Sequence, residues 1–295
     1  MKKISFLIVF MAIALVSNAQ NTVELRLNLP KGQTFKQNMD MKMNIKMEVH
    51  GIKIDTEVPF FTLISYRVTE VKDQNFTLEA SYDVIRMKMN IIGQNLEFDS
   101  ENPDKDNPLN AFLGMIGKKF LMTLDKFGNV VKVEGLEKLF DEILNGKNFT
   151  EEQKNQMMLL IADLFSEDKI KENFSLSTVV FPEEPVTEGF GWEAEIKQNI
   201  SDMNMLVFNK FKVEKINAET VEISCISDYK MDFSLEQNGT TANAKLENAQ
   251  AESSYVVDIK TGWTKSATSK SDMVIQMTAN GISFPMQITY EFTVK

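Results

Sequence analysis

The stretch Met39-Asp-Met-Lys-Met-Asn-Ile-Lys-Met-Glu-Val49 decides the fold. Its apolar residues stand at every second position, and polar residues fill the positions between them. Because successive side chains of a strand point to opposite faces, this pattern predicts one long strand with an apolar face and a solvated face. Such strands are typical of antiparallel sheets that cover a core with one side only.

The same alternation returns at 76–84, 221–225, 274–277 and 288–294, and turn residues separate these stretches. Three central helices are predicted, at 109–116, 136–144 and 150–164, from apolar residues at helical spacing and a capping box at Thr150. We therefore predict a mainly β protein (β-rich α+β) of curved antiparallel sheets with helices inserted centrally. An outer-membrane barrel is the alternative, but the helices and the few Tyr and Trp residues count against it.

The two halves of the chain carry a similar order of motifs. The stretch Gly32-Gln-Thr-Phe35 is echoed by Gly189-Phe-Gly-Trp192, and apolar positions in 66–83 match positions in 211–228 at a constant offset. A duplication predicts a first β repeat at 20–180, which holds the helices, and a second at 181–295. The alternative is that any two alternating hairpins look alike.

The N-terminus predicts export. Lys2 and Lys3 precede an apolar run of about thirteen residues, and small residues end at Ala19 before Gln20. We expect residues 1–19 to be a signal peptide cleaved between Ala19 and Gln20, because this run is short for a bilayer core about 30 Å thick. A retained membrane helix is the alternative. No cysteine stands at the cleavage point, so we expect a periplasmic or extracellular protein without a lipid anchor or stable membrane span.

Composition narrows the partners. The net charge is −10, and removal of Lys2 and Lys3 takes it to about −12, which opposes binding to nucleic acid. The single cysteine, Cys225, cannot form an internal disulfide, and its place in an alternating stretch predicts a buried apolar role. We expect no cofactor, and the sequence leaves the oligomeric state open.

Two hairpin motifs carry a resemblance. A Leu-Asp-x-x-Gly-x-Val hairpin at Leu124-Asp-Lys-Phe-Gly-Asn-Val130 and the late Val256-Val-Asp-Ile-Lys-Thr-Gly-Trp263 follow Gly-x-x-aromatic starts and long amphipathic strands. This order resembles a family of exported bacterial proteins known only as a domain of unknown function. More loosely, it is similar to the half-barrel carriers of lipoproteins and lipids in the periplasm. The resemblance implies a curved sheet and supplies no catalytic residues.

The methionines at positions 39, 41, 43 and 47, which share one face of the predicted strand, suggest a function. Methionine is flexible and polarizable, so a sheet face rich in it can adapt to apolar ligands of varied shape. We predict a non-catalytic binding module with an apolar groove for a lipid or other hydrophobic small molecule. Ordinary core packing of the same residues is the alternative interpretation. The predicted ligand face comprises Met39, Met41, Met43, Met47, Met87, Met89, Phe112 and Ile116.

Other functions are less favoured. A structural or interaction protein of the cell envelope, bound to an envelope protein, is the second hypothesis. A hydrolase would depend on His50, the single histidine, for which no partner is apparent. The Met-x-Met spacings could bind Cu(I) through thioethers, and the acidic loop at 99–107 has oxygen ligands for calcium but lacks the glycine and glutamate of an EF-hand. We therefore predict no metal site.

Overall fold

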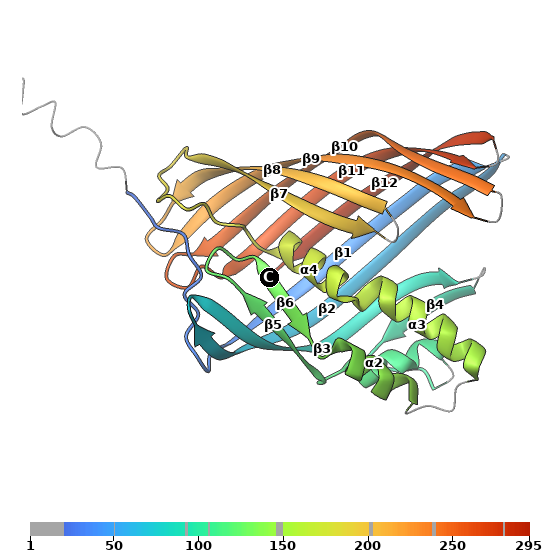
Figure 1. Cartoon of the computed structure of the whole chain (residues 1–295), viewed down its shortest axis with the longest axis horizontal. Helices are drawn as coiled ribbons and strands as arrows, with labels where there is room; N and C mark the ends of the chain where they lie inside the picture. Colours follow the sequence, from blue (N-terminus) through green and yellow to red (C-terminus); the bar gives the residue numbers. More distant parts are fainter. Residues whose placement is uncertain are drawn as a thin grey trace, which may run out of the picture.

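The computed structural model describes residues 21–49, 51–91, 94–105, 107–145, 150–200, 203–237, 240–279 and 281–295. Its mainly β composition confirms the predicted fold class (Figure 1). In chain order its elements are β1 Thr34–Val49, β2 Ile52–Lys72, β3 Asn75–Ile91, β4 Gln94–Asp99, the 3-10 helix η1 Pro108–Met115, β5 Lys119–Leu124, β6 Val130–Glu134, α2 Leu136–Asn145, α3 Glu151–Phe165, α4 Glu167–Ser177, β7 Gly191–Ile200, β8 Met203–Ile216, β9 Thr220–Gln237, β10 Thr240–Asp258, β11 Thr264–Ala279 and β12 Ile282–Val294.

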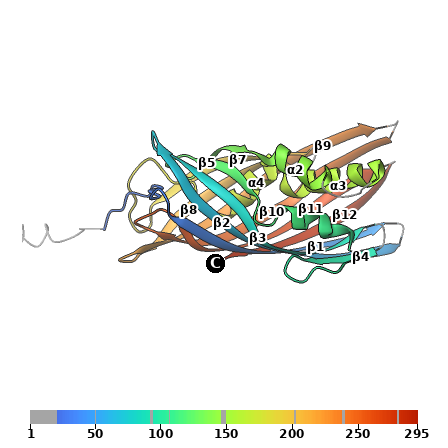
Figure 2. The same cartoon turned by 90° about the horizontal axis from the view of Figure 1, so that it is seen from below.

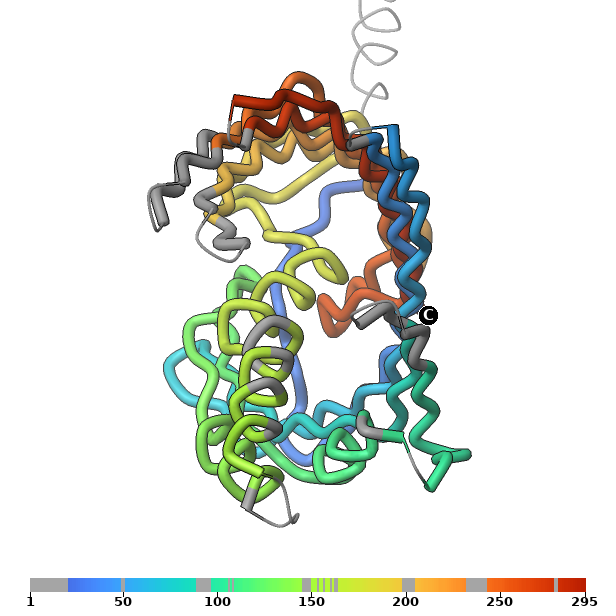
Figure 3. The backbone as a smooth tube through the Cα atoms, turned by 90° about the vertical axis from the view of Figure 1, so that its right-hand side faces the viewer, coloured from blue at the N-terminus to red at the C-terminus, as the bar shows by residue number. Residues whose placement is uncertain are grey.

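All twelve strands form one antiparallel sheet. The strand order is β6-β5-β3-β2-β1-β12-β11-β10-β9-β8-β7, and β4 pairs with β3. The first strand pairs with the last, which places Met39 opposite Val294 and Met47 opposite Met286. Figure 3 shows the sheet end on, curved into a C, and the sheet is not closed into a barrel. The strands of the two halves of the chain therefore belong to one continuous curved sheet.

Two hairpins, one in each half of the chain, share a register. Each has three apolar cross-strand pairs, and each has a bulge directly after the second pair. The pairs are Tyr66–Ala80, Val68–Leu78 and Val71–Phe76 in β2–β3, and Phe211–Cys225, Val213–Ile223 and Ile216–Val221 in β8–β9. The similarity of the two halves thus extends from the sequence pattern to individual strand pairs.

The helices lie on the concave side of the sheet (Figures 1 and 2). The predicted helical segments correspond to η1, α2 and α3, and a fourth helix, α4, was not predicted. Ser166 caps α4 by accepting a hydrogen bond from the Lys169 backbone N–H at 3.4 Å, while Ile170 and Phe174 anchor its buried side. Because α4 contacts β6, β7 and β11, it bridges the two edges of the C.

The segment before β1 closes one end of the concave side. Its Val23 pairs with Val186, the Leu27 N–H donates to the Lys126 carbonyl at 2.9 Å, and the Asn28 N–H donates to the Thr261 carbonyl at 2.9 Å. This segment therefore joins the predicted turns after β5 and β10, one from each half of the chain. Figures 1 and 2 place it at the end opposite the β1–β2 hairpin tip. We call this the closed end.

Candidate functional site

The concave face of the sheet is covered unequally. One part of this face packs against the helices in the main core, which includes Met39, Phe112 and Phe165. Figure 3 shows the helices gathered on the side of the first-half strands, across from β8 to β12. The face that β8 to β12 present farther from the closed end forms a second, separate apolar cluster.

We call this second cluster the methionine face. Alternation along each strand and the register between strands place its side chains on the concave side. Its buried members are Met205, Val207, Met231, Ala244 and Ile275, and its half-buried members are Ile196, Tyr229, Leu246, Met277, Met286 and Ile288. Half-burial of large apolar side chains leaves apolar surface in water, which is unfavourable unless something covers it.

Strand β1 extends the methionine face. Met43, Ile45 and Met47 lie opposite Tyr290, Ile288 and Met286 of β12, respectively, and are half-buried. Beyond them, at the end of the sheet opposite the closed end, three isoleucines on the same concave side are exposed: Ile52 at 67%, Ile54 at 36% and Ile282 at 40%. We call these three residues the rim. Apolar side chains thus become more exposed from the middle of the sheet toward the rim.

A band of small residues, most of them polar, separates the methionine face from the main core. It crosses the concave side of β8 to β11 and consists of Asn209, Ser227, Ala251, Ser253, Ser269 and Ser271. The Ser227 hydroxyl donates to Asn209 Oδ1 at 2.6 Å, and the Ser253 hydroxyl donates to Ser269 at 2.9 Å. The Ser271 hydroxyl is buried and interacts with the Tyr229 side chain, which works against the rise in the Tyr229 pKa that burial causes.

Helix α4 brings a half-buried ion pair to this band. Lys169 Nζ lies 2.7 Å from Glu172 Oε2, and their side chains are 21% and 16% exposed. Burial raises the pKa of Tyr229 to about 12, and the nearby Glu172 carboxylate adds to this shift. Burial, followed by the Glu172 charge, also raises the pKa of Tyr290. Both phenols are therefore protonated at neutral pH, next to a carboxylate that lies on the concave side.

A cleft of about 270 Å³ opens where α4 bridges the two sheet edges. It is lined by Glu172 and Ser175 of α4, by Asn129 after β5, and by Ile196 and Lys197 of β7. Its size is close to the lower end of the range for small-molecule sites. Because Ile196 also belongs to the methionine face, the cleft adjoins that face at the β7 edge.

The predicted ligand residues fall into two groups. Met39, Met87 and Phe112 are buried in the main core, and Ile116 packs against it. Met41 also packs there, and its sulfur accepts a hydrogen bond from the Tyr290 hydroxyl at 3.0 Å. Met43 and Met47 continue the methionine face. Met89 lies in β3 opposite Leu96, but its side chain, like Ala19, Gln20 and His50, lies outside the described residues.

Several residues of this region were missed from the sequence. Lys169 and Glu172 belong to the unpredicted α4, and Ser271 belongs to a stretch without apolar alternation. One signal for α4 was present in the sequence: Ser166 is followed by acidic residues, which is typical of a helix start. For the methionine face, the missed signal was the Met273-Val-Ile-Gln-Met277 segment continuing the stripe of β1 across two strands.

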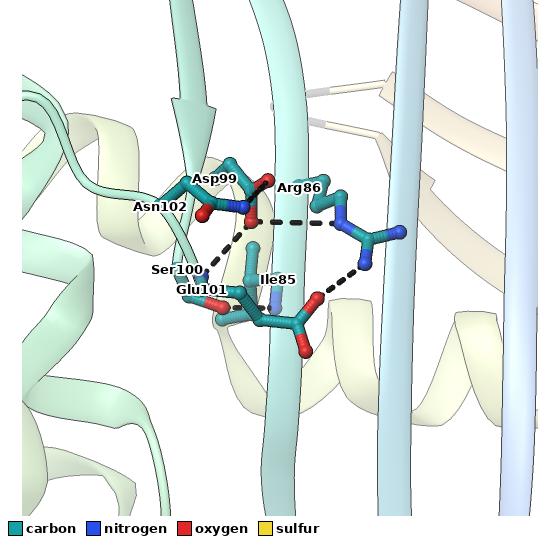
Figure 4. Close-up of polar contacts among 6 residues, drawn as sticks. All are labelled: Ile85, Arg86, Asp99, Ser100, Glu101 and Asn102. Atoms are coloured by element: carbon teal, nitrogen blue, oxygen red, sulfur yellow. Dashed lines mark hydrogen bonds and ion pairs between the residues drawn. The ribbon is translucent and has the colours of Figure 1, made fainter.

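The acidic loop after β4 is held by an arginine. Figure 4 shows Arg86 of β3 between two carboxylates: its Nε lies 3.5 Å from Asp99, and it forms an ion pair with Glu101. Asp99 also accepts hydrogen bonds from the Asn102 side chain at 3.1 Å and the Glu101 N–H at 2.9 Å. These contacts lower the pKa of Asp99, with the Asn102 hydrogen bond the largest cause. Two carboxylates of the loop, Asp99 and Glu101, are thus engaged by protein groups.

The described ranges contain neither a cluster of metal-binding side chains nor a membrane-spanning helix. No three His, Cys, Asp or Glu side chains gather there in an arrangement that could hold a metal ion. Among the helices of those same ranges, none combines the length and apolar character needed to cross a bilayer.

The fold and the concave face define the class: an open, curved-sheet α+β protein with a partly uncovered apolar inner surface. The model of DUF6263, described as a family of unknown function, matches residues 73–264. The chain therefore belongs to the DUF6263 family, as the two hairpin motifs within that range suggested. No curated protein matches it.

Among solved structures, a lipovitellin structure on lipid–protein interactions is similar at a TM-score of 0.51 and 10% identity. The match covers 90% of this chain and 25% of the lipovitellin chain, so the present chain spans a quarter of that protein. At this identity the likeness concerns the fold alone. The Salmonella typhi OmpF complex with daunomycin matches at a TM-score of 0.25 and 4% identity, over 92% of this chain and 100% of OmpF.

Proposed function

We propose that this protein is a non-catalytic binding module that holds a lipid or another hydrophobic ligand on the methionine face. The observation that carries the proposal is the partly uncovered apolar surface that runs from the small polar band to the rim. Within the described chain, α4 contacts β7 and β11 of this half, whereas η1 and α2 pack on each other. The three isoleucines of the rim are exposed. A bound apolar ligand would remove this surface from water.

Two further points support the proposal. Methionine side chains repack easily, so a face that contains Met205, Met231, Met277 and Met286 can accommodate ligands of different shape. The similar fold in lipovitellin occurs in a structure that concerns lipid–protein interactions. We further infer, from residues 1–19, that the protein acts in the periplasm or outside the cell, where such a ligand needs shielding from water.

Native mass spectrometry of protein isolated from its own cell envelope tests the proposal. We expect apolar mass that stays bound to the folded chain and leaves on extraction with organic solvent. The stripped protein should then bind an apolar dye such as 1-anilinonaphthalene-8-sulfonate. A ligand-free mass together with no dye binding would sink the proposal.

A pair of variants locates the binding surface. Met286→Glu puts a charge on the methionine face, whereas Gln287→Glu puts the same charge on the opposite face of the same strand, where the side chain is exposed. We expect Met286→Glu to weaken dye binding at least about tenfold, because burial of an unpaired carboxylate is costly. Gln287→Glu should bind like the parent protein. Equal binding by both variants would place the dye elsewhere.

A further inference from the structure

An unbroken apolar row joins the methionine face to the rim. It runs across the concave side of five neighbouring strands, and each member lies opposite the next in the strand register: Ile54 of β2, Met47 of β1, Met286 of β12, Ile275 of β11 and Leu246 of β10. Exposure rises along this row from 6% at Ile275 to 36% at Ile54. Beyond the row, Ile52 begins β2 and Ile282 begins β12, so the concave side stays apolar up to the start of both strands.

The charges of the β1–β2 hairpin near the rim are balanced and lie on its convex side. Residues of opposite charge face each other there in three places: Lys42 and Glu57, Lys46 and Asp55, and Glu48 and Lys53. The first two are ion pairs with N–O distances of 2.9 and 3.6 Å. Because side chains alternate between the faces of a strand, none of these charges shares the concave side with the rim. The hairpin thus offers an apolar side without net charge behind it.

The apolar area of the rim is too small for a protein interface. Its three isoleucines together expose about as much surface as one and a half fully exposed isoleucines, which is on the order of 200 Å² of apolar area. A stable complex with a second copy or another folded protein needs about 800 Å² from each partner. A lipid bilayer has no such requirement, because its fluid interface surrounds any apolar group and binding grows with the area inserted. The rim therefore fits a bilayer better than a protein.

We propose that the rim docks this protein reversibly on a bilayer of zwitterionic lipids, with Ile52, Ile54 and Ile282 inserted at the level of the head groups. This inference rests on the proposed function, because the rim is the open end of the surface that would hold the ligand. The net charge of −10 opposes binding to an anionic bilayer. A docked rim brings the methionine face to the membrane, so a hydrophobic ligand would pass between the two without crossing water.

Flotation with phosphatidylcholine vesicles tests the docking surface. The chain is used without residues 1–19, because that apolar run would itself bind lipid. We expect the parent protein to float with the vesicles and the double variant Ile52→Ser, Ile282→Ser to bind at least about tenfold more weakly. Ile226→Ser is the matched control: this isoleucine is 45% exposed on the convex side of β9, and its loss should change nothing. Equal binding by the double variant and the parent would overturn the proposal; urea melts of all three check their folding.

A fluorescence measurement locates the inserted residues directly. Brominated phosphatidylcholine quenches an indole that enters the bilayer, so it should quench the tryptophan emission of Ile52→Trp. The emission of Ile226→Trp, on the convex side, should stay unchanged. The native Trp192 and Trp263 pack in the main core and give the same background in both variants. Equal quenching of the two variants would show that the rim is not the surface that enters the lipid.

The outcomes separate this inference from the proposed function. A parent protein that binds the apolar dye but no vesicles would overturn the docking and leave the proposed function standing. Vesicle binding without dye binding would contradict the proposed function instead. Vesicles that contain phosphatidylglycerol should bind the protein more weakly at low salt, because both surfaces are negative. Tighter binding to them would refute the assignment to zwitterionic lipid, and rim-dependent dimers without vesicle binding would assign the rim to a second copy.

Discussion

Val68 and Val213 hold the same position in two different hairpins. The Val68 carbonyl accepts from the Gly32 N–H at 2.8 Å, and its N–H donates to the Gln33 carbonyl at 2.9 Å. The Val213 carbonyl accepts from the Gly189 N–H at 2.8 Å, and its N–H donates to the Phe190 carbonyl at 2.9 Å. The two Gly-x-x-aromatic motifs are therefore the same structural device, a turn that starts the strand paired with the hairpin: β1 beside β2, and β7 beside β8.

Both glycines of this device adopt the left-handed backbone region, with φ of 87° at Gly32 and 82° at Gly189, and open space surrounds both. Gly32→Ala and Gly189→Ala should each lower the free energy of unfolding by about 1 kcal/mol, from backbone strain alone. Urea denaturation of both variants checks this. Asn tolerates this region better than Ala, so Gly32→Asn should cost less. A neutral effect at one site only would refute the equivalence.

Gly262 is a different case. A Cβ atom there would lie 2.2 Å from the Arg26 carbonyl oxygen, and φ is 69°. Gly262→Ala should cost about 3 kcal/mol, because strain adds to a clash with backbone that the closed end holds in place. The control is Gly281→Ala, with φ of 77° and open space, which should cost about 1 kcal/mol. Thermal and urea melts of both compare these values; similar losses would show that the closed end yields easily.

Phe165 attaches the end of α3 to the main core. It is buried against the rings of Phe60, Tyr82 and Phe112, at centroid distances of 6.2, 5.4 and 5.5 Å. Phe165→Ala should destabilise the fold by about 3 to 5 kcal/mol through the cavity it leaves. Leu159→Ala on the same helix, where the side chain is 69% exposed, should change stability by less than about 0.5 kcal/mol. Equal effects in denaturant titrations would contradict this packing.

The thiol of Cys225 should be unreactive in the folded protein. Burial raises its pKa from 9.0 to about 11, so at pH 8 iodoacetamide should modify the folded chain about a hundredfold more slowly than the chain in denaturant. Mass spectrometry of quenched samples measures both rates. Fast modification of the folded chain would mean that the sheet opens at β9.

The same shift makes stability depend on pH. The folded pKa is the higher one, so the stabilisation is complete below pH 9 and is lost as pH rises toward 11. We expect the parent protein to lose about 2 to 3 kcal/mol over this window more than Cys225→Ala does. Urea titrations at pH 8 and pH 10.5 compare the two. Parallel losses would assign the effect to other groups.

Much of the fold follows from period and turns. The alternation at Met39–Val49 predicts its strand correctly because one face of β1 does meet apolar neighbours over its whole length. The turn around Asp125 is also correct, since the Asp125 carboxylate accepts from the Phe127 and Asn129 N–H groups at 2.9 Å. These features are local, and the sequence within a few residues determines them.

Which parts of the concave face the helices bury could not be predicted in this way. Met39 and Met47 look alike in the sequence, yet Met39 is buried in the main core whereas Met47 lies half-buried toward the rim. The difference comes from α4, whose few apolar anchors give a weak periodic signal, and from the pairing of β1 with β12. Glu172 and Tyr290 lie far apart in the chain, so the effect of the Glu172 charge on Tyr290 depends on tertiary structure alone.

The pairing of β1 with β12 also sets the order of events during folding. Half of the hydrogen-bonding edge of β1 has no partner until the last strand of the chain is available. Contacts between the two ends of a chain form slowly, and a long unpaired strand edge invites aggregation while it waits. The nascent chain therefore needs protection from aggregation until its synthesis is complete. Loss of β12 alone would leave one edge of β1 permanently unpaired.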